Sequence, residues 1–206
     1  MHIDCVERFI YLFYLSNFDF VKRYDSEPNS AFVITCLDGI DAHRVDDGLA
    51  WYNMSTIVGF FKTMGFLLDE LERNGLMLLK IDIEKIYWVN HNGATILFYT
   101  DFRDIMTISE GVREGGKEMI IMSAFKKTVF MHKSMHEIKQ IPAPIKYDVI
   151  YHNLGYIVYW LLFRDADFDI SKISELNGKD GEASDLCVRL KYSLNRCIKE
   201  RLFIWI

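Results

Sequence analysis

The sequence predicts an α+β domain that is mainly helical and carries small β elements. Apolar residues recur at helical spacing over 54–73 and 146–163, and capping residues flank the first of these segments. Two short β-type runs, IYWV at 86–89 and TILFY at 95–99, are separated by NHNG, which is typical of a β-hairpin. With 206 residues and 50% hydrophobic content, the chain can bury a sizeable core, so we expect one domain.

The N-terminal part of the chain predicts a helix followed by a strand. From Cys5 to about Phe20 apolar residues recur at helical spacing, with Glu7 near the start. The stretch SEPNS predicts a turn. The segment AFVITCLDGID at 31–41 then reads as a β-strand that runs into a glycine turn at Asp38 and Gly39.

The segment 54–73 predicts a long and mostly buried helix. Asn53 or Ser55 is the expected N-cap, and Asn74 followed by Gly75 is the expected stop. Five aromatic residues in and before this helix are expected to fill the core rather than to stack on bases: Trp51, Tyr52, Phe60, Phe61 and Phe66.

The second half of the chain alternates loops and helices. EGVREGG predicts a loop, IIMSAF at 120–125 a short strand or helical turn, and Pro142 and Pro144 a break. Helices are expected over 146–163 and 185–199, with NGKDGEAS as a loop before the second. The apolar run LGYIVYWLLF at 154–163 is about half of the ~20 residues that a membrane-spanning helix needs, so it predicts a buried core helix.

Composition excludes several classes of function. The net charge of -5 argues against general affinity for nucleic acid or an anionic membrane. The four cysteines contain no CxxC pair, so neither a zinc site nor a disulfide framework is indicated, and no secretion signal is recognisable at the N-terminus. We therefore expect a cytoplasmic protein that has a protein partner and binds neither nucleic acid nor membrane.

No metal or cofactor site is predicted from local spacing. His132 and His136 lie four residues apart, but a zinc protease motif would read H-E-x-x-H, which this segment does not. The aspartates at 38, 41, 46 and 47 lack the alternating ligands and distal glutamate of a calcium loop. A charged surface is the simpler interpretation of both groups.

Four longer segments together resemble the protein-kinase family. They are FVITCLDGID, NGLMLLKIDIEKIYWVNHNGATILFYTDF, APIKYDVIYHNLGYIVYWLLF and KYSLNRCIKERLF. In this order they are similar to the last strand of the kinase upper lobe with its hinge, the catalytic loop through D-F-G, the A-P-E motif with its following helix, and a late helix. LGYIVY is similar to the casein-kinase and vaccinia-related branch of the family.

The resemblance implies a helical kinase-like lower lobe at 38–206 and a remnant upper lobe at 1–37. The remnant would hold the regulatory helix, one or two strands and the hinge. On this match the adenine slot would be lined by Ile34, Thr35, Cys36 and Leu37. Only 100 residues precede Asp101, where D-F-G would begin, so we expect a single truncated kinase-like domain.

The departures from the family pattern predict that catalysis is lost. A kinase needs a glycine-rich loop over the phosphates, a strand lysine, a catalytic aspartate, and an Asp and Asn that hold magnesium. Neither the glycine-rich loop nor the strand lysine has a match, and Arg103 replaces the glycine after Asp101 and Phe102. Arg103 is a permanent cation that can pair with Asp101 in place of a metal.

Two alignments of the catalytic loop are open. Matched from its glycine, GLMLLKIDIEKI places Lys80 at the catalytic aspartate and Lys85 at the metal-binding asparagine. A two-residue shift keeps Asp82 as the aspartate but puts Tyr87 at the asparagine. We prefer the first, because it matches Ile81, Glu84 and Ile86 without a gap; both alignments lose the second metal ligand.

The helix that follows the A-P-E match also departs from the family. The family places an acid five residues before the helix glycine, and Ile150 stands there, whereas Asp148 lies seven residues before Gly155. We therefore do not expect the buried hydrogen bonds from this helix to the catalytic loop.

These observations predict an inactive kinase-like binding protein, a decoy or allosteric regulator of a protein kinase, without cofactor. It would resemble the truncated kinase mimics of large DNA viruses. Its interface, with a kinase or with a second copy, is expected at Phe9, Phe13 and Val33. Two alternatives are an atypical active kinase that uses Asp82 and Asp101, and a helical scaffold protein whose motif matches are chance.

Overall fold

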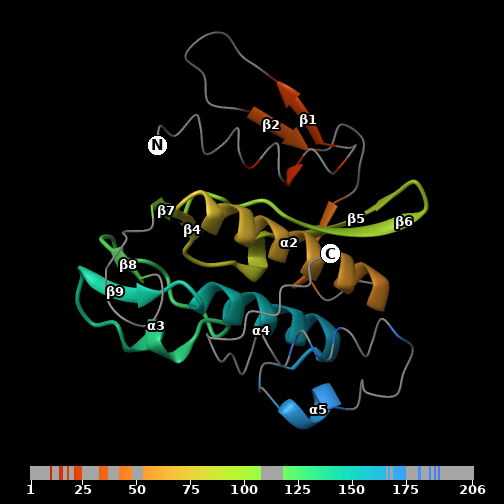
Figure 1. The fold of residues 1–206 in the computed structure, drawn as a ribbon. Coiled ribbons are helices and arrows are strands. Elements are labelled where there is room, and N and C mark those ends of the chain that lie inside the picture. Colours follow the sequence, from red (N-terminus) through yellow and green to blue (C-terminus); the bar gives the residue numbers. More distant parts are fainter. Residues whose placement is uncertain are drawn as a thin grey trace.

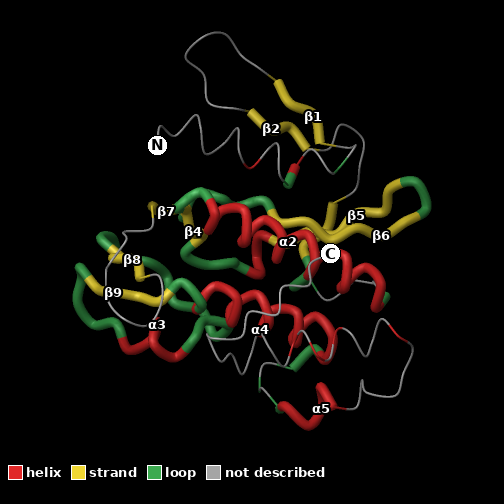
Figure 2. The backbone as a smooth tube through the Cα atoms, viewed as in Figure 1, coloured by secondary structure: helices red, strands yellow, loops and turns green. Residues whose placement is uncertain are grey.

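The computed structural model shows a helical body with small sheets around it (Figure 1). It describes residues 10, 14, 15, 18, 21–24, 33–36, 42–47, 53–107, 118–165, 167, 169–174, 181, 186, 188 and 190. At its centre, helix α2 (Met54–Arg73) packs along helix α4 (Val149–Phe163). In Figure 2 the strands, coloured yellow, lie above and beside these two helices.

Helix α2 confirms the sequence prediction at both ends. Asn53 is its N-cap, and its Oδ1 accepts a hydrogen bond from the backbone N–H of Thr56 at 2.9 Å. Asn74 is the C-cap, and Gly75 follows at φ +69°, a left-handed conformation that glycine adopts without strain. The helix ends where the sequence predicts because these two residues satisfy its last carbonyl groups.

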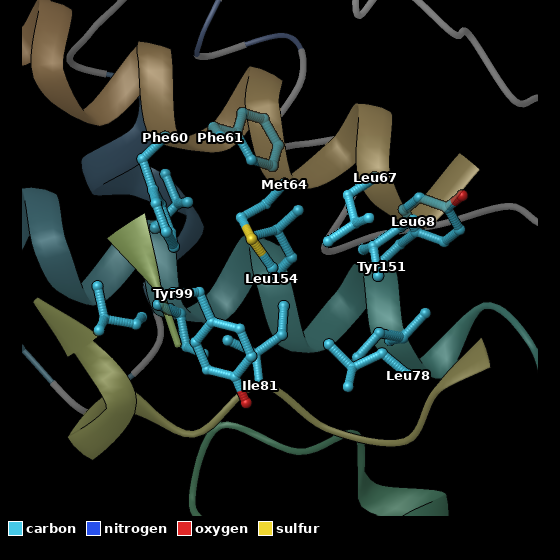
Figure 3. Packing of buried hydrophobic residues seen from close by; sticks show 14 of the residues in the cluster. Phe60, Phe61, Met64, Leu67, Leu68, Leu78, Ile81, Tyr99, Tyr151 and Leu154 are labelled. Carbon is cyan, nitrogen blue, oxygen red and sulfur yellow. The ribbon is translucent and has the colours of Figure 1, made fainter. Parts of the chain in front are cut away.

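The core forms where α2 meets α4 (Figure 3). Phe61, Met64 and Leu68 of α2 are fully buried, and Leu154 of α4 is fully buried beside them. The prediction for the aromatic residues is confirmed for Phe60 and Phe61 but wrong for Phe66, which is 43% exposed. Phe66 lies on the side of α2 that faces solvent, away from the buried side formed by Phe61, Met64 and Leu68.

A hairpin of β5 (Ile86–His91) and β6 (Ala94–Tyr99) confirms the predicted β element. Asn92 and Gly93 at its tip both have positive φ, 50° and 78°, as a two-residue turn between twisted strands requires. Strand β3 (Ala42–Arg44) joins the sheet next to β5, giving the order β3-β5-β6. The hairpin is longer than predicted, because Asn90, His91 and Ala94 also pair.

Two further pairs of short antiparallel strands lie in the described part of the chain. Strand β4 (Leu76–Leu78) pairs antiparallel with β7 (Ile105–Thr107). Strand β8 (Glu118–Ile121) pairs antiparallel with β9 (Ala143–Lys146). Strand β8 confirms a short strand near 120, but the break expected at the prolines is wrong in part, since Pro144 lies inside β9. Proline is tolerated at such an edge, where its missing N–H is not needed.

The N-terminal strands lie in a ribbon of their own in Figure 1. Strand β2 (Val33–Cys36) confirms the predicted strand, and it pairs with β1 (Val21–Tyr24), which the sequence did not reveal. The predicted first helix, the SEPNS and EGVREGG segments, Trp51, Tyr52 and the last predicted helix lie wholly or mostly outside the described residues.

Helix α4 confirms the predicted core helix, although it begins at Val149 rather than near Lys146. Most of its residues from Val149 to Leu161 are buried, and it ends at Arg164 in the left-handed conformation. Two short helices, α3 (Lys133–Glu137) and α5 (Ile170–Ser174), were not predicted. Within the described residues, no helix has the length and apolarity to cross a membrane.

Candidate functional site

The two motif segments come together as a pair of adjacent loops. The first, 79–85, follows β4, and the second, 100–104, follows β6. The backbone N–H of Leu79 donates to the carbonyl oxygen of Asp104 at 2.9 Å, and that of Thr100 donates to the carbonyl oxygen of Lys85 at 3.1 Å. We call these segments the paired loops. All six degenerate positions that the sequence singled out lie on them: Lys80, Asp82, Lys85, Asp101, Phe102 and Arg103.

Asp101 forms a two-point ion pair with Arg103. The guanidinium Nε donates to Asp101 Oδ1 at 2.8 Å and Nη2 donates to Oδ2 at 2.7 Å. The backbone N–H of Arg103 adds a third bond to Oδ1 at 3.2 Å. These bonds hold the pKa of Asp101 below its ordinary value, the side-chain hydrogen bond from Arg103 being the main cause. The pairing expected from the sequence is confirmed, and both carboxylate oxygens are engaged.

The other acids of the paired loops also have partners. Lys80 Nζ lies 3.6 Å from Asp104 Oδ2, and Lys126 Nζ lies 3.6 Å from Glu84 Oε1. Asp82 is 92% buried, and its Oδ1 accepts from the backbone N–H of Glu84 at 3.1 Å, capping the 3₁₀ turn Ile83–Lys85. Positive and negative side chains therefore neutralise one another within the site.

The backbone of Lys85 is hydrogen-bonded to the residue that precedes Asp101. Its carbonyl oxygen accepts from both the N–H and the hydroxyl of Thr100, the residue before Asp101. The charge of Lys85 contributes, as a smaller cause after Arg103, to the low pKa of Asp101. Two cations, Arg103 and Lys85, therefore lie close enough to Asp101 to lower its pKa.

Asn153 of α4 anchors the first loop, which corrects our expectation from Ile150. Its Oδ1 accepts from the backbone N–H of Ile81 at 2.6 Å, and its Nδ2 donates to the carbonyl oxygen of Phe130 at 3.1 Å. The side chain is 2% exposed. Position 153 is one helical turn beyond Ile150 and so faces the same neighbours. A search for polar residues at that spacing would have found it.

Aromatic contacts fix the second loop. The ring of Phe102 packs edge-on against Tyr14 and Tyr99, with centroids 5.4 and 5.3 Å apart. Tyr14 Oη accepts from the backbone N–H of Tyr99 at 2.6 Å, and Tyr99 Oη accepts from that of Asp82 at 3.3 Å. Burial raises the pKa of Tyr99. Tyr14, from the N-terminal segment, is thus part of the core and supports the paired loops.

The remaining predicted site residues are placed only in part. Val33, Ile34, Thr35 and Cys36 lie in β2, where the backbone alone is described, so their side-chain roles stay predictions. Phe9, Phe13, Leu37 and Glu7 lie outside the described residues.

The histidine pair has a structural role in α3. His132 caps this short helix, with its Nδ1 accepting from the N–H of Ser134 at 3.2 Å, and His136 is exposed at the other end. Across the described ranges no three His, Cys, Asp or Glu side chains are grouped so that they could hold a metal ion.

Comparison with solved structures identifies the fold. The chain is similar to the kinase of the Cydia pomonella granulovirus, with a TM-score of 0.55 over 98% of this chain and 77% of that one, at 14% sequence identity. It is one of 111 matching chains. No protein-family profile matches the sequence, and no curated protein does. The chain therefore has an α+β, kinase-like fold.

Proposed function

We propose that this chain is a catalytically inactive, kinase-like binding protein that acts as a decoy or allosteric regulator of a protein kinase. It corresponds to a kinase lower lobe with a remnant upper lobe, and it needs no cofactor. A functional parallel is the class of truncated kinase mimics from large DNA viruses, and the granulovirus kinase is a viral protein of similar fold.

The ion pair between Asp101 and Arg103 carries this proposal. Phosphoryl transfer depends on magnesium that bridges the phosphates and neutralises the developing charge. Arg103 engages both oxygens of the one carboxylate that matches the family's metal ligand. Lys85, at the asparagine position of our preferred alignment, adds a second positive charge nearby. Electrostatic repulsion and the occupied oxygens both disfavour a metal ion at this point.

The alternative of an atypical active kinase finds less support. It would use Asp82 to accept the proton of a substrate hydroxyl, which requires that the carboxylate reach the substrate. Asp82 is largely buried and caps the 3₁₀ turn behind it. A change of conformation in the loop would be needed to free it.

Regulation by binding requires an interface, and we propose Phe9, Phe13 and Val33 for it. This part of the proposal rests on the sequence pattern of residues 5–20, which predicts a helix, and on the strand at 33–36. The partner would be a protein kinase domain or a second copy of this chain. Replacing Phe9 and Phe13 by Asp should abolish association, because charge is costly in a desolvated interface. Retained association by a folded double variant would rule out this surface.

A phosphotransfer assay tests the absence of catalysis. Purified full-length chain is incubated with labelled ATP, generic acceptor proteins and either magnesium or manganese. We expect no transfer above that of an equally purified blank preparation. Asp82→Asn and Asp101→Asn are the matched controls: activity that either substitution abolishes would overturn the proposal and favour the atypical kinase. Activity that both variants retain would come from a contaminating kinase and would leave the expected result standing.

A further inference from the structure

The segment around β8 and β9 exposes an unusual amount of apolar side chain. Of the six large hydrophobic residues that are exposed among the described residues, four lie between positions 120 and 141: Ile120, Met122, Val129 and Ile141. Met122 and Val129 are the most exposed, at 67% and 63%. Single exposed apolar residues need no explanation, but a group of them marks an interaction surface.

Strand pairing places several of these side chains on one face. Ile120 pairs directly with Pro144 and Ile121 with Ala143. Burial alternates along both strands: Ile121, Ala143 and Ile145 are buried, whereas Ile120, Pro144 and Lys146 are exposed. Met122 continues the exposed side of β8, and Ile141 and Pro142 lead into β9. The outer side of the β8–β9 pair therefore carries Ile120, Met122 and Pro144 together with Lys146.

The same segment is basic, although the chain as a whole is acidic. Residues 118–146, from the start of β8 to the end of β9, contain five lysines and two glutamates, Glu118 and Glu137, in a chain of net charge -5. All five lysines are exposed: Lys126, Lys127, Lys133, Lys139 and Lys146. We call this combination of exposed apolar and basic side chains on 120–146 the apolar-basic face.

Two of the lysines are available to a partner. Lys127 Nζ donates to the carbonyl oxygens of His136 and Ile138 at the end of α3, and Lys126 lies beside Glu84 of the paired loops. Lys146 lies opposite Glu118 in the β8–β9 pairing. Within the described part of the chain, Lys133 and Lys139 form no ion pair, so a carboxylate from another molecule could pair with them without displacing an internal contact.

The geometry points to a docking surface for an acidic, apolar segment of another protein, and we propose this as its occupant. Pro142 and Pro144 carry no N–H, so the partner is held by side-chain contacts rather than by extending the ladder from β9. Acidic side chains would meet the lysines while apolar ones cover Ile120 and Met122. RNA would offer phosphates to the lysines but no apolar side chains to cover Ile120 and Met122.

This proposal uses other residues than the proposed contact at Phe9, Phe13 and Val33, and it does not depend on whether the chain transfers phosphate. The two proposals therefore fail independently: the phosphotransfer assay decides catalysis, and a peptide-binding experiment decides the apolar-basic face.

Fluorescence anisotropy with three synthetic peptides tests the proposal on the full-length chain. The first is a twelve-residue peptide of alternating glutamate and leucine; the second has lysine in place of glutamate, and the third has serine in place of leucine. We expect only the first to bind. Its binding should weaken as ionic strength rises from about 0.1 M to about 1 M, because the Debye length falls from about 10 Å to about 3 Å. Equal binding of all three peptides, or binding of none, would overturn the proposal.

Variants locate the binding to the surface. Lys133→Glu combined with Lys139→Glu, and separately Met122→Asp, should each weaken binding of the first peptide by about tenfold or more. The matched control is Lys62→Glu combined with Phe66→Asp on α2, which changes a lysine and an exposed aromatic residue elsewhere and should leave binding unchanged. Circular dichroism checks that each variant is folded. An equal loss in the control would contradict the location.

The other occupants are tested with the same variants. Sedimentation of phosphatidylserine vesicles and anisotropy with duplex RNA measure the two polyanions, and sedimentation velocity measures self-association. Binding to vesicles, RNA or a second copy that Met122→Asp abolishes, without binding of the first peptide, would replace our proposal with that occupant.

Discussion

The helices of the α2–α4 core and the motif segments of the paired loops were both singled out from the sequence, but different forces hold them. In the core, apolar side chains such as Phe61 and Leu154 are removed from water and touch one another. In the paired loops, Asp101 and Arg103 form an ion pair whose cation remains 81% exposed. Burial of a large apolar side chain stabilises a fold by about 1.5–3 kcal/mol, whereas an exposed ion pair contributes about 0–1 kcal/mol. The fold therefore depends on the core, and the loops are free to vary in chemistry.

This difference explains how a kinase-like fold persists while its motifs change. Leu78 before the first loop is fully buried, and so is the helix α4 residue Leu154. Arg103 fits at its position because its side chain is 81% exposed and pairs with Asp101. Substitution of such an exposed loop residue costs the fold little stability.

The largest effect is expected in the core. Phe61→Ala should lower the free energy of unfolding by about 3–5 kcal/mol, because it removes a fully buried ring and leaves a cavity. Phe66→Ala, on the same helix but 43% exposed, should change it by less than about 0.5 kcal/mol. Urea denaturation of both variants measures the difference. Similar losses in the two would mean that the described packing of α2 is incorrect.

An intermediate effect is expected where the core supports the loops. Asn153→Ala leaves the N–H of Ile81 and the carbonyl oxygen of Phe130 buried without this partner, and each such group costs about 1–3 kcal/mol. Asn90→Ala removes an exposed asparagine that bonds only Thr95 among the described residues and is the control. Thermal unfolding should rank Asn153→Ala well below Asn90→Ala. An unchanged melting temperature for Asn153→Ala would contradict its anchoring role.

The smallest effect is expected at the ion pair itself. Arg103→Gln should lower the free energy of unfolding only slightly near neutral pH, and by less than Asn153→Ala, because exposed ion pairs contribute little. The pKa of Asp101 is lowered in the folded state, so the pair's contribution is present above the unfolded value of about 3.9 and is lost as the pH falls through the lower, folded value. The difference between wild type and Arg103→Gln should therefore shrink below about pH 4.

Arg73→Gln is the matched control for this pH series. Arg73 pairs with Glu70 on the surface of α2, away from the paired loops. NMR titration of the Asp101 carboxyl should show its pKa rising toward the ordinary value in Arg103→Gln and unchanged in Arg73→Gln. A pKa of Asp101 that is the same in all three proteins would show that the ion pair does not form in solution.

The sequence was sufficient for elements whose signals are local. Helix α2 was placed from Asn53 to Gly75 because caps and helical periodicity are encoded by neighbouring residues. The turn at Asn92 and Gly93 was found for the same reason. The pairing of Asp101 with Arg103 could be predicted because the two residues are only two positions apart.

Features that depend on distant contacts were missed. Asn153 is 72 residues from Ile81, so its position on α4 can be read from the sequence, but its contact with that loop cannot. Tyr14 supports Phe102 and Tyr99 across a similar separation. Strand β1 has little signal of its own, because a four-residue strand is defined mainly by its pairing with β2. Only the folded chain shows how these residues meet.

Binding of manganese, a paramagnetic substitute for magnesium, tests the central claim that Arg103 has taken the place of the metal at Asp101. Electron paramagnetic resonance measures free manganese during titration of the full-length wild-type chain, with and without ATP, beside Asp101→Asn. We expect wild type and Asp101→Asn to lower the free manganese signal equally, since neither offers a free carboxylate at position 101. A stoichiometric manganese site in the wild type that Asp101→Asn abolishes would contradict it.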